Sequence, residues 1–225
     1  MRLIEQTHKG VLVSSGRGEI HCQRVIVSVP TPLYKEITFS PPLAEAKAEL
    51  SKAATLGYQV KVIVLYDSPW WRTHGLCGLI QSFKGPVCVT RDSSVEEKKQ
   101  YSLTCFVSGK PGIELSNMTQ PERFEAVLKQ IKRVYGPFVG GVVPPPLAIT
   151  EHEWSNDQWA QGCPCPVLPP GVMTDFGQAL RSPHGKIHFV GTETAFEWKG
   201  YMDGAIRSGE RGAKEVIRIL DRPRL

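Results

Sequence analysis

The segment from Ile187 to Leu220 holds residue types well suited to binding a ligand. A short apolar run ends at Gly191, and a glycine lets the backbone approach a ligand closely. Glu193 follows in the turn, where its carboxylate can accept hydrogen bonds from ligand hydroxyl groups. Gly200 then opens a helical pattern, and the free N–H groups of a helix start favour an electron-rich ligand edge. The order predicts a ligand site, although an ordinary strand, loop and helix in which Glu193 only caps a turn would read the same way.

A lysine in the middle of an apolar strand pattern is the second candidate. In segment 56–66, alternation places Val60, Val62 and Val64 on one face and Lys61 on the other. Burying an ammonium group is costly unless another group pairs with it. Lys61 therefore either has a functional environment or lies in a strand at a sheet edge, where its side chain reaches water.

Two cysteines, Cys163 and Cys165, form the third candidate, in a proline-rich segment that begins at Trp154. A thiolate near an electrophilic ligand atom can form a covalent bond. A pair of unreactive buried thiols has the same sequence pattern. A single C-x-C pair without a second ligand pair does not predict a metal site, and we expect none.

The strand-to-helix phrase IHFVGTETAFEWKGYMDGA, the lysine strand LGYQVKVIVLY and the segment WSNDQWAQGCPCPVLPPG together resemble the flavin-containing amine oxidases, the monoamine oxidases in particular. The resemblance covers nearly the whole chain and is most specific from Trp154 onward. It implies FAD as the cofactor. It also implies oxidation of primary or secondary amines to an aldehyde and ammonia or an amine, with dioxygen giving hydrogen peroxide.

The resemblance also implies which residues bind the flavin. Glu193, with Gly191 and the backbone of Thr192, would bind the ribityl side, and the helix start at Gly200 and Met202 would face the pyrimidine edge. Further along the family pattern, Cys163 falls where monoamine oxidases attach the flavin 8α-methyl group through a thioether. The FAD is therefore expected to be bound here, with a covalent link through Cys163 as one form of it.

The catalytic residues implied by the resemblance are Lys61, Trp154 and Tyr201. Lys61 matches the lysine that holds a water against flavin N5, and Trp154 matches a tryptophan beside the flavin. Tyr201 matches one wall of an aromatic cage that orients the substrate amine. Phe106 matches an aromatic residue of the substrate cavity, although a plain core phenylalanine is the alternative.

The chain departs from the monoamine oxidase pattern at two positions. Cys105, before Phe106, stands where the family often has glycine. Pro164 stands where monoamine oxidases have the tyrosine that forms the second wall of the cage. Either another residue replaces this wall, with Trp159 as a candidate, or the substrate is not a typical arylalkyl amine. A polyamine oxidase-type enzyme therefore stays open as an alternative.

The sequence contains no G-x-G-x-x-G phosphate-binding loop after a strand. Gly16 and Gly18 stand between two strand-like runs and predict a hairpin turn instead. Because the family carries that loop near its N-terminus, the chain resembles only the C-terminal half of the family. We therefore expect either a missing N-terminal half as a partner or a non-catalytic fragment that cannot bind FAD.

The expected fold is mixed α/β, the C-terminal part of a two-domain amine oxidase with a mixed substrate-domain sheet flanked by helices. Residues 1–50 and 157–225 would belong to the FAD-binding domain and residues 51–156 to the substrate-binding domain. A capping box at Thr119 and Glu122 predicts a helix that ends at Gly136. Helices are also expected over 43–54 and 200–220, and strands over 1–6, 10–14, 19–29, 56–66, 76–81, 87–90, 102–108 and 188–190.

The composition and charge of the chain exclude some classes of binding partner. The chain has 41% hydrophobic and 22% charged residues and a net charge of +5, with scattered lysines and arginines. We therefore expect no nucleic acid partner and no transmembrane segment. The resemblance implies a small amine substrate and dioxygen as partners, and a homodimer is also expected. Six unevenly spaced cysteines favour a reducing, intracellular compartment. The ending Pro223-Arg224-Leu225 loosely resembles a peroxisomal tail, so the expected location is peroxisomal or cytoplasmic.

Overall fold

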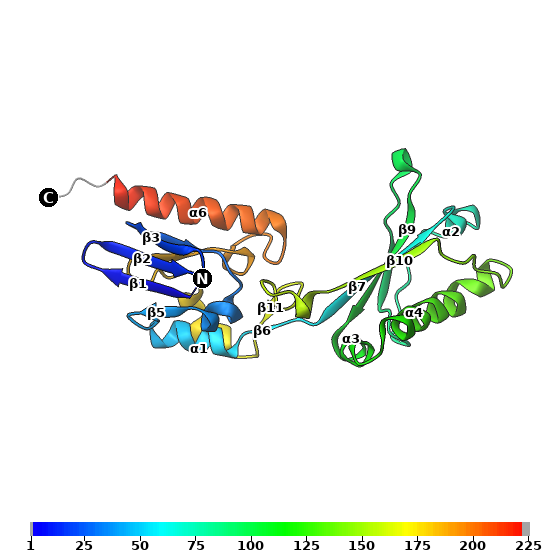
Figure 1. Ribbon diagram of the computed structural model, residues 1–225, viewed down its shortest axis with the longest axis horizontal. Coiled ribbons are helices and arrows are strands. Elements are labelled where there is room, and N and C mark those ends of the chain that lie inside the picture. Colours follow the sequence, from blue (N-terminus) through cyan, green and yellow to red (C-terminus); the bar gives the residue numbers. More distant parts are fainter. Residues whose placement is uncertain (1, 222–225) are drawn as a thin grey trace. The chain divides into compact units, whose positions relative to one another are not determined.

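The computed structural model describes residues 2–221 and divides the chain into two compact units. Unit 1 contains residues 1–56 and 164–225, and unit 2 contains residues 57–163. Each unit combines sheets with helices, which confirms the expected mixed α/β class (Figure 1). In the described range, no helix is long and apolar enough to cross a membrane. The peroxisome-like tail lies outside the described residues.

Unit 1 contains three small sheets. The largest has the order β3-β2-β1-β5, in which β1 pairs antiparallel with β2 and parallel with β5. The second joins β4 and β12 in parallel, and the third joins β6 and β11. The strands are β1 Leu3–Thr7, β2 Gly10–Ser15, β3 Gly18–Cys22, β4 Val25–Val27, β5 Thr38–Ser40, β6 Thr55–Leu56, β11 Pro166–Val167 and β12 Ile187–Phe189.

The core of unit 1 forms where the inward residues of these strands meet. Its buried members are Ile4, Val11, Val27, Tyr34, Ile37, Phe39, Ile187 and Phe189. The helices of this unit are α1 Glu45–Ala53, α5 Val172–Phe176 and α6 Met202–Leu220. Helix α6 lies against the parallel pair, since Gly212 on α6 adjoins Val190 directly after β12.

Unit 2 is built on one antiparallel sheet with the order β10-β7-β9-β8. Its strands are β7 Gln59–Tyr66, β8 Val89–Asp92, β9 Tyr101–Ser108 and β10 Ala148–Glu153, and its helices are α2 Trp70–Thr73, α3 Gly109–Ser116 and α4 Gln120–Tyr135. Buried side chains of β7 and β9 share one core with Leu115 of α3 and with Val127 and Ile131 of α4. The capping box is confirmed, because the Thr119 N–H donates to Glu122 Oε2 over 2.8 Å.

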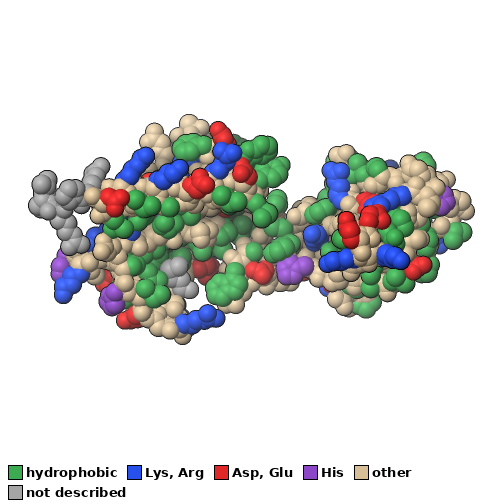
Figure 2. Space-filling view, turned by 90° about the horizontal axis from the view of Figure 1, so that it is seen from above, with side chains coloured by type: hydrophobic (Ala, Val, Ile, Leu, Met, Phe, Trp, Pro, Cys, Tyr) green, Lys and Arg blue, Asp and Glu red, His purple; other side chains and the backbone are tan. Residues whose placement is uncertain are grey.

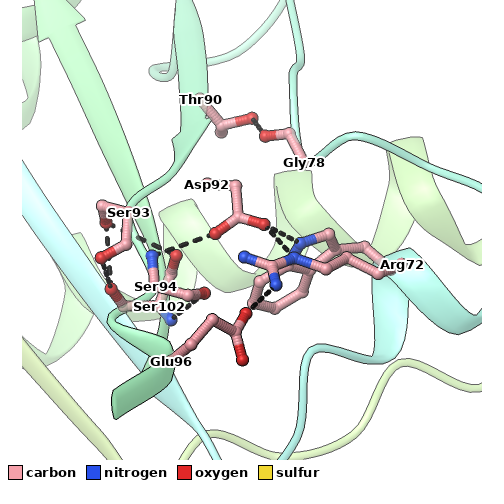
Figure 3. Close-up of polar contacts among 9 residues, drawn as sticks. Arg72, Gly78, Thr90, Asp92, Ser93, Ser94, Glu96 and Ser102 are labelled. Carbon is pink, nitrogen blue, oxygen red and sulfur yellow. Dashed lines mark hydrogen bonds and ion pairs between the residues drawn. The ribbon is translucent and has the colours of Figure 1, made fainter. Parts of the chain in front are cut away.

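The tryptophan pair after β7 is structural. Trp70 and Trp71 are buried in the core of unit 2, 4% and 0% exposed. Trp71 Nε1 donates to Asp92 Oδ2 over 2.8 Å, and Arg72 Nε donates to the same oxygen over 2.5 Å. Figure 3 shows Arg72 between Asp92 and Glu96, so this network fixes the turn after β7 to strand β8.

Several predicted strands are wrong in their bounds. Residues 76–81 form only an isolated bridge at Gln81, because Thr90 Oγ1 accepts the Ile80 N–H and donates to Gly78 O (Figure 3). The run 19–29 is two strands, since the chain leaves β2 after Cys22 and β4 pairs with β12 instead. The predicted 87–90 strand shifts to β8, whereas α3 and β10 were not predicted at all.

Acidic and basic side chains are interspersed on the face of each unit that Figure 2 shows. This distribution agrees with the scattered lysines and arginines of the sequence.

Candidate functional site

Lys61 lies in the middle of the unit 2 sheet, on the face opposite the core. Strand β7 alternates strictly, with Val60, Val62 and Val64 buried and Lys61 half-buried. Because β10 and β9 flank β7 on both sides, the edge-strand alternative for Lys61 is wrong. The described residues contain no ion pair to Lys61, so its ammonium group stays available to a ligand or water.

The register of the sheet brings other predicted residues to Lys61. Phe106 on β9 and His152 on β10 are its direct neighbours across the two strand pairs. Residues directly opposite in antiparallel strands lie on the same face, about 4.5–5.5 Å apart at Cβ. Trp154 follows β10, and its ring centroid lies 4.5 Å from that of His152 at an angle of 73°. Lys61, Phe106 and Trp154 therefore gather on one side of unit 2, with His152 between Lys61 and Trp154.

Cys163 is anchored to the start of the same β7 strand. Its backbone N–H donates to Gly57 O over 3.0 Å, and its thiol donates to Gln59 Oε1 over 3.3 Å. Gln59 and Lys61 are alternate residues of β7 and therefore share a face. Burial raises the pKa of the Cys163 thiol, which disfavours the nucleophilic thiolate.

Unit 1 contains the other predicted residues, beginning at the end of β12. Gly191 has φ 118°, a conformation that favours glycine, and its N–H donates to Ser208 Oγ over 2.9 Å. A side chain at this position would also place its Cβ 3.0 Å from Glu193 Oε2. Gly191 is therefore needed both for the backbone turn and for the space beside the carboxylate.

Glu193 is a buried carboxylate, 8% exposed, in the 3₁₀ turn Thr192–Thr194. Burial raises its pKa, which its own backbone N–H and the positive charge of Lys199 offset only in part. No side chain among the described residues donates a hydrogen bond to it. A buried carboxylate without a side-chain donor can accept hydrogen bonds from the hydroxyl groups of a ligand.

Thr192 connects this turn to the start of α6. Its Oγ1 accepts the Gly200 N–H over 2.7 Å and donates to Tyr201 O over 2.9 Å. Tyr201 and Met202 are 67% and 84% exposed, and α6 begins at Met202 without a side-chain cap. The first N–H groups of α6 can therefore bind an electron-rich group, as the helical pattern predicts.

A family model described as flavin containing amine oxidoreductase matches residues 1–217. The chain belongs to this family. Among curated members, it is 35% identical over 221 residues to amine oxidase [flavin-containing] B of Cavia porcellus. It is also 35% identical over 217 residues to an L-amino acid dehydrogenase of Synechocystis sp.. The two matches cover 96% of this chain but only 42% and 45% of the relatives, so the chain spans less than half of their length.

Solved structures show the same fold. Cyclohexylamine oxidase from Brevibacterium oxydans matches with a TM-score of 0.90 and 31% identity, covering 98% of this chain and 48% of that one. A putrescine oxidase bound to putrescine matches with a TM-score of 0.88 and 28% identity, covering 96% and 48%. The chain therefore has the fold of the matching part of these oxidases, and its family membership implies a flavin cofactor.

The residues present fit a flavin in each unit taken by itself. In unit 1 the Glu193 carboxylate, which accepts from no side chain of the described residues, and the uncapped start of α6 offer an acceptor and donors. In unit 2 the face with Lys61 and Phe106 is free of the core. Only Cys163 fits less well, since a hydrogen-bonded thiol with a raised pKa is a poor nucleophile.

Three residues of this arrangement were not predicted. Gln59 could have been found, because alternation alone places it on the face of Lys61. His152 depends on the register of β10, a strand that was not predicted. Trp198 was also missed; its ring lies 6.1 Å from that of Tyr201 at 90°, whereas the candidate Trp159 belongs to unit 2. Trp159 as the second cage wall stays a prediction.

Proposed function

We propose that this chain supplies part of an FAD-dependent amine oxidase. The enzyme would oxidise a primary or secondary amine to an imine, which water hydrolyses to an aldehyde and ammonia or an amine. Dioxygen would accept the two electrons and form hydrogen peroxide. The observation that carries the proposal is Lys61, placed in a central strand on an open face between Phe106 and His152.

The two compact units support separate roles in binding the flavin and the substrate. We assign unit 1 to the flavin-binding domain and unit 2 to the substrate-binding domain, with a boundary that shifts the expected 51–156 to 57–163. Glu193, Gly191 and Thr192 would bind the ribityl chain, and the N–H groups at Met202 would face the pyrimidine edge.

The flavin and the side chains around it would have different roles in the reaction. When bound, the flavin supplies the acceptor for the hydride equivalent of the amine. Lys61 would hold a water at flavin N5, Phe106 would line the substrate space and Trp154 would shield the flavin ring. Tyr201 would orient the amine with its exposed ring. His152 is the neighbour of Lys61 on β10, and the proposed reaction starts from the neutral amine.

We further propose that the flavin is attached covalently through Cys163. A C–S bond would form from Cys163 Sγ to the 8α-methyl group. The thiol proton and one methyl proton would leave, and dioxygen would accept the electron pair. The oxidant for this step is dioxygen, which the proposed amine oxidation already uses.

Two alternatives follow from particular observations. Similarity to a putrescine oxidase and the proline at position 164 support a polyamine oxidase-type substrate. The lack of a G-x-G-x-x-G loop in the 225 residues supports a chain that is non-catalytic by itself. A homodimer and a peroxisomal or cytoplasmic location stay predictions.

The test is a titration of the purified chain with FAD, followed by peroxide assays with benzylamine, cyclohexylamine and putrescine. We expect a bound flavin spectrum, and in Lys61→Met an equally strong flavin spectrum with much slower reoxidation by dioxygen. Lys129→Met, on the exposed side of α4, is the matched control. If the chain binds no flavin, it either needs a missing N-terminal half or is non-catalytic. Unchanged reoxidation in Lys61→Met would remove Lys61 from the mechanism.

A further inference from the structure

A row of polar side chains crosses one end of the unit 2 sheet on the face of Lys61. Gln59 on β7 is paired in register with Ser108 on β9, and Gln59 Nε2 donates to Ser108 Oγ over 3.3 Å. Cys88, next to β8, directs its thiol to Ser108 Oγ over 3.6 Å and to Phe106 O over 3.1 Å. Cys163 completes the row at Gln59.

The Gln59 amide lies with its Nε2 toward Ser108 and its Oε1 toward Cys163. An amide has donors on its nitrogen and acceptor lone pairs on its oxygen. With Nε2 donating to Ser108, Oε1 is directed to Cys163 and accepts its thiol proton over 3.3 Å. The Cys163 backbone is held independently by Gly57 O, so the sulfur cannot easily move away from this acceptor.

This contact favours the protonated form of the sulfur. A carbonyl oxygen accepts a hydrogen bond from a thiol but gives none to a thiolate, and burial acts in the same direction. The titratable and charged groups of the sheet on this face are Lys61, His152, Arg91 and Cys88.

We propose that Gln59 sets the nucleophilicity of Cys163 by holding its thiol proton. In the proposed enzyme, on which the link to flavin rests, Gln59 acts as a positioning residue: a C–S bond to the flavin can form only after this hydrogen bond is released. The contact is made within unit 2, so it can be tested on the chain alone.

The experiment measures the rate of alkylation of Cys163 by iodoacetamide against pH, by mass spectrometry, in a Cys165→Ser background. Gln59→Glu keeps the size of the side chain but adds a negative charge beside the sulfur. We expect roughly tenfold slower alkylation at pH 8, since one pKa unit changes the thiolate fraction tenfold. Gln59→Lys places a cation there, and we expect roughly tenfold faster alkylation.

The control is Gln100→Glu, which makes the same charge change just before the opposite end of β9 and should leave the rate within about twofold. Opposite shifts in the two Gln59 variants support the proposal, because loosened packing would speed alkylation in both. A faster rate in both variants, or no change in either, would overturn it.

A parallel FAD titration separates this inference from the proposed function. Opposite alkylation shifts without any flavin binding would leave the role of Gln59 intact and overturn flavin binding by this chain alone. Flavin binding together with alkylation rates that are the same in all residue 59 variants would support the proposed function and overturn the role of Gln59.

Discussion

Three glycines of α6 should respond in different ways to the same Gly→Ala change. A methyl group at Gly209 meets no atom within 4 Å, whereas one at Gly212 would lie 2.4 Å from Val190 Cγ1. At Gly204 it would lie 2.2 Å from Trp198 O. The helix propensity gain is the same in kind for all three, so the differences report how tightly α6 packs on β12 and on the loop before it.

The magnitudes follow from these distances. Gly209→Ala should raise the free energy of unfolding by about 0.8–1 kcal/mol, the propensity difference between alanine and glycine. Two carbons normally approach to about 3.5–4.0 Å, so Gly212→Ala must displace a buried, β-branched valine at a cost of about 1–3 kcal/mol. Its net effect is a loss of up to about 2 kcal/mol. Gly204→Ala meets backbone rather than a side chain and should lose at least as much.

Urea unfolding of the three variants, followed by circular dichroism, measures these differences. Equal slopes with shifted midpoints would show that only stability has changed. The decisive comparison is Gly209→Ala with Gly212→Ala, because both lie in the helix interior. If Gly212→Ala stabilised the chain as much as Gly209→Ala, the packing of α6 on Val190 described above would be wrong.

Two carboxylates should show opposite pH behaviour. Asp92→Asn should cost about 2–3 kcal/mol, because donors on Arg72, Trp71 and Ser94 lose a charged acceptor, whereas the exposed Glu96→Gln should cost under about 1 kcal/mol. Although burial opposes it, these donors lower the pKa of Asp92, so its contribution is complete above about pH 4 and is lost as the pH falls further. Glu193→Gln should instead stabilise the flavin-free chain by about 1 kcal/mol at pH 7, because burial raises the pKa of Glu193. That gain should vanish below about pH 4, where the unfolded carboxyl is also protonated. Thermal melts at pH 3.5, 5 and 7 check both, and a Glu193→Gln variant that is less stable than the parent at pH 7 would contradict the second.

The elements that alternation and capping define could be predicted from the sequence. Strand β7 has the predicted faces, and α4 begins at the predicted capping box. These features depend on residues within one turn or one strand. The 19–29 run shows the limit of such patterns, because nothing local to it reveals that β4 leaves the hairpin to pair with a strand at 187–189.

The candidate site was predictable residue by residue but not as an arrangement. Lys61 and Phe106 came from separate stretches, and only the register of β7 with β9 makes them neighbours. His152 could not be found in advance, since its strand has an exposed, polar side without a strong apolar pattern. Register between distant strands is set by the packed core of Val60, Val62 and Leu103, which no local pattern specifies.

The perturbed carboxylates show how a structural charge differs from a functional one. Asp92 is surrounded by donors that lower its pKa, so its charge is stabilised by the fold itself. Glu193 is buried in the opposite condition, with a raised pKa and no side-chain donor among the described residues. We assign Glu193 to ligand binding, because the hydroxyl groups of a ligand beside Gly191 would offset the cost of burying this carboxylate. In unit 2, Lys61 is the counterpart, a half-buried lysine in a central strand with no ion pair in the described sheet. The Asp92 network therefore holds a turn in place, whereas we assign Glu193 and Lys61 to the flavin.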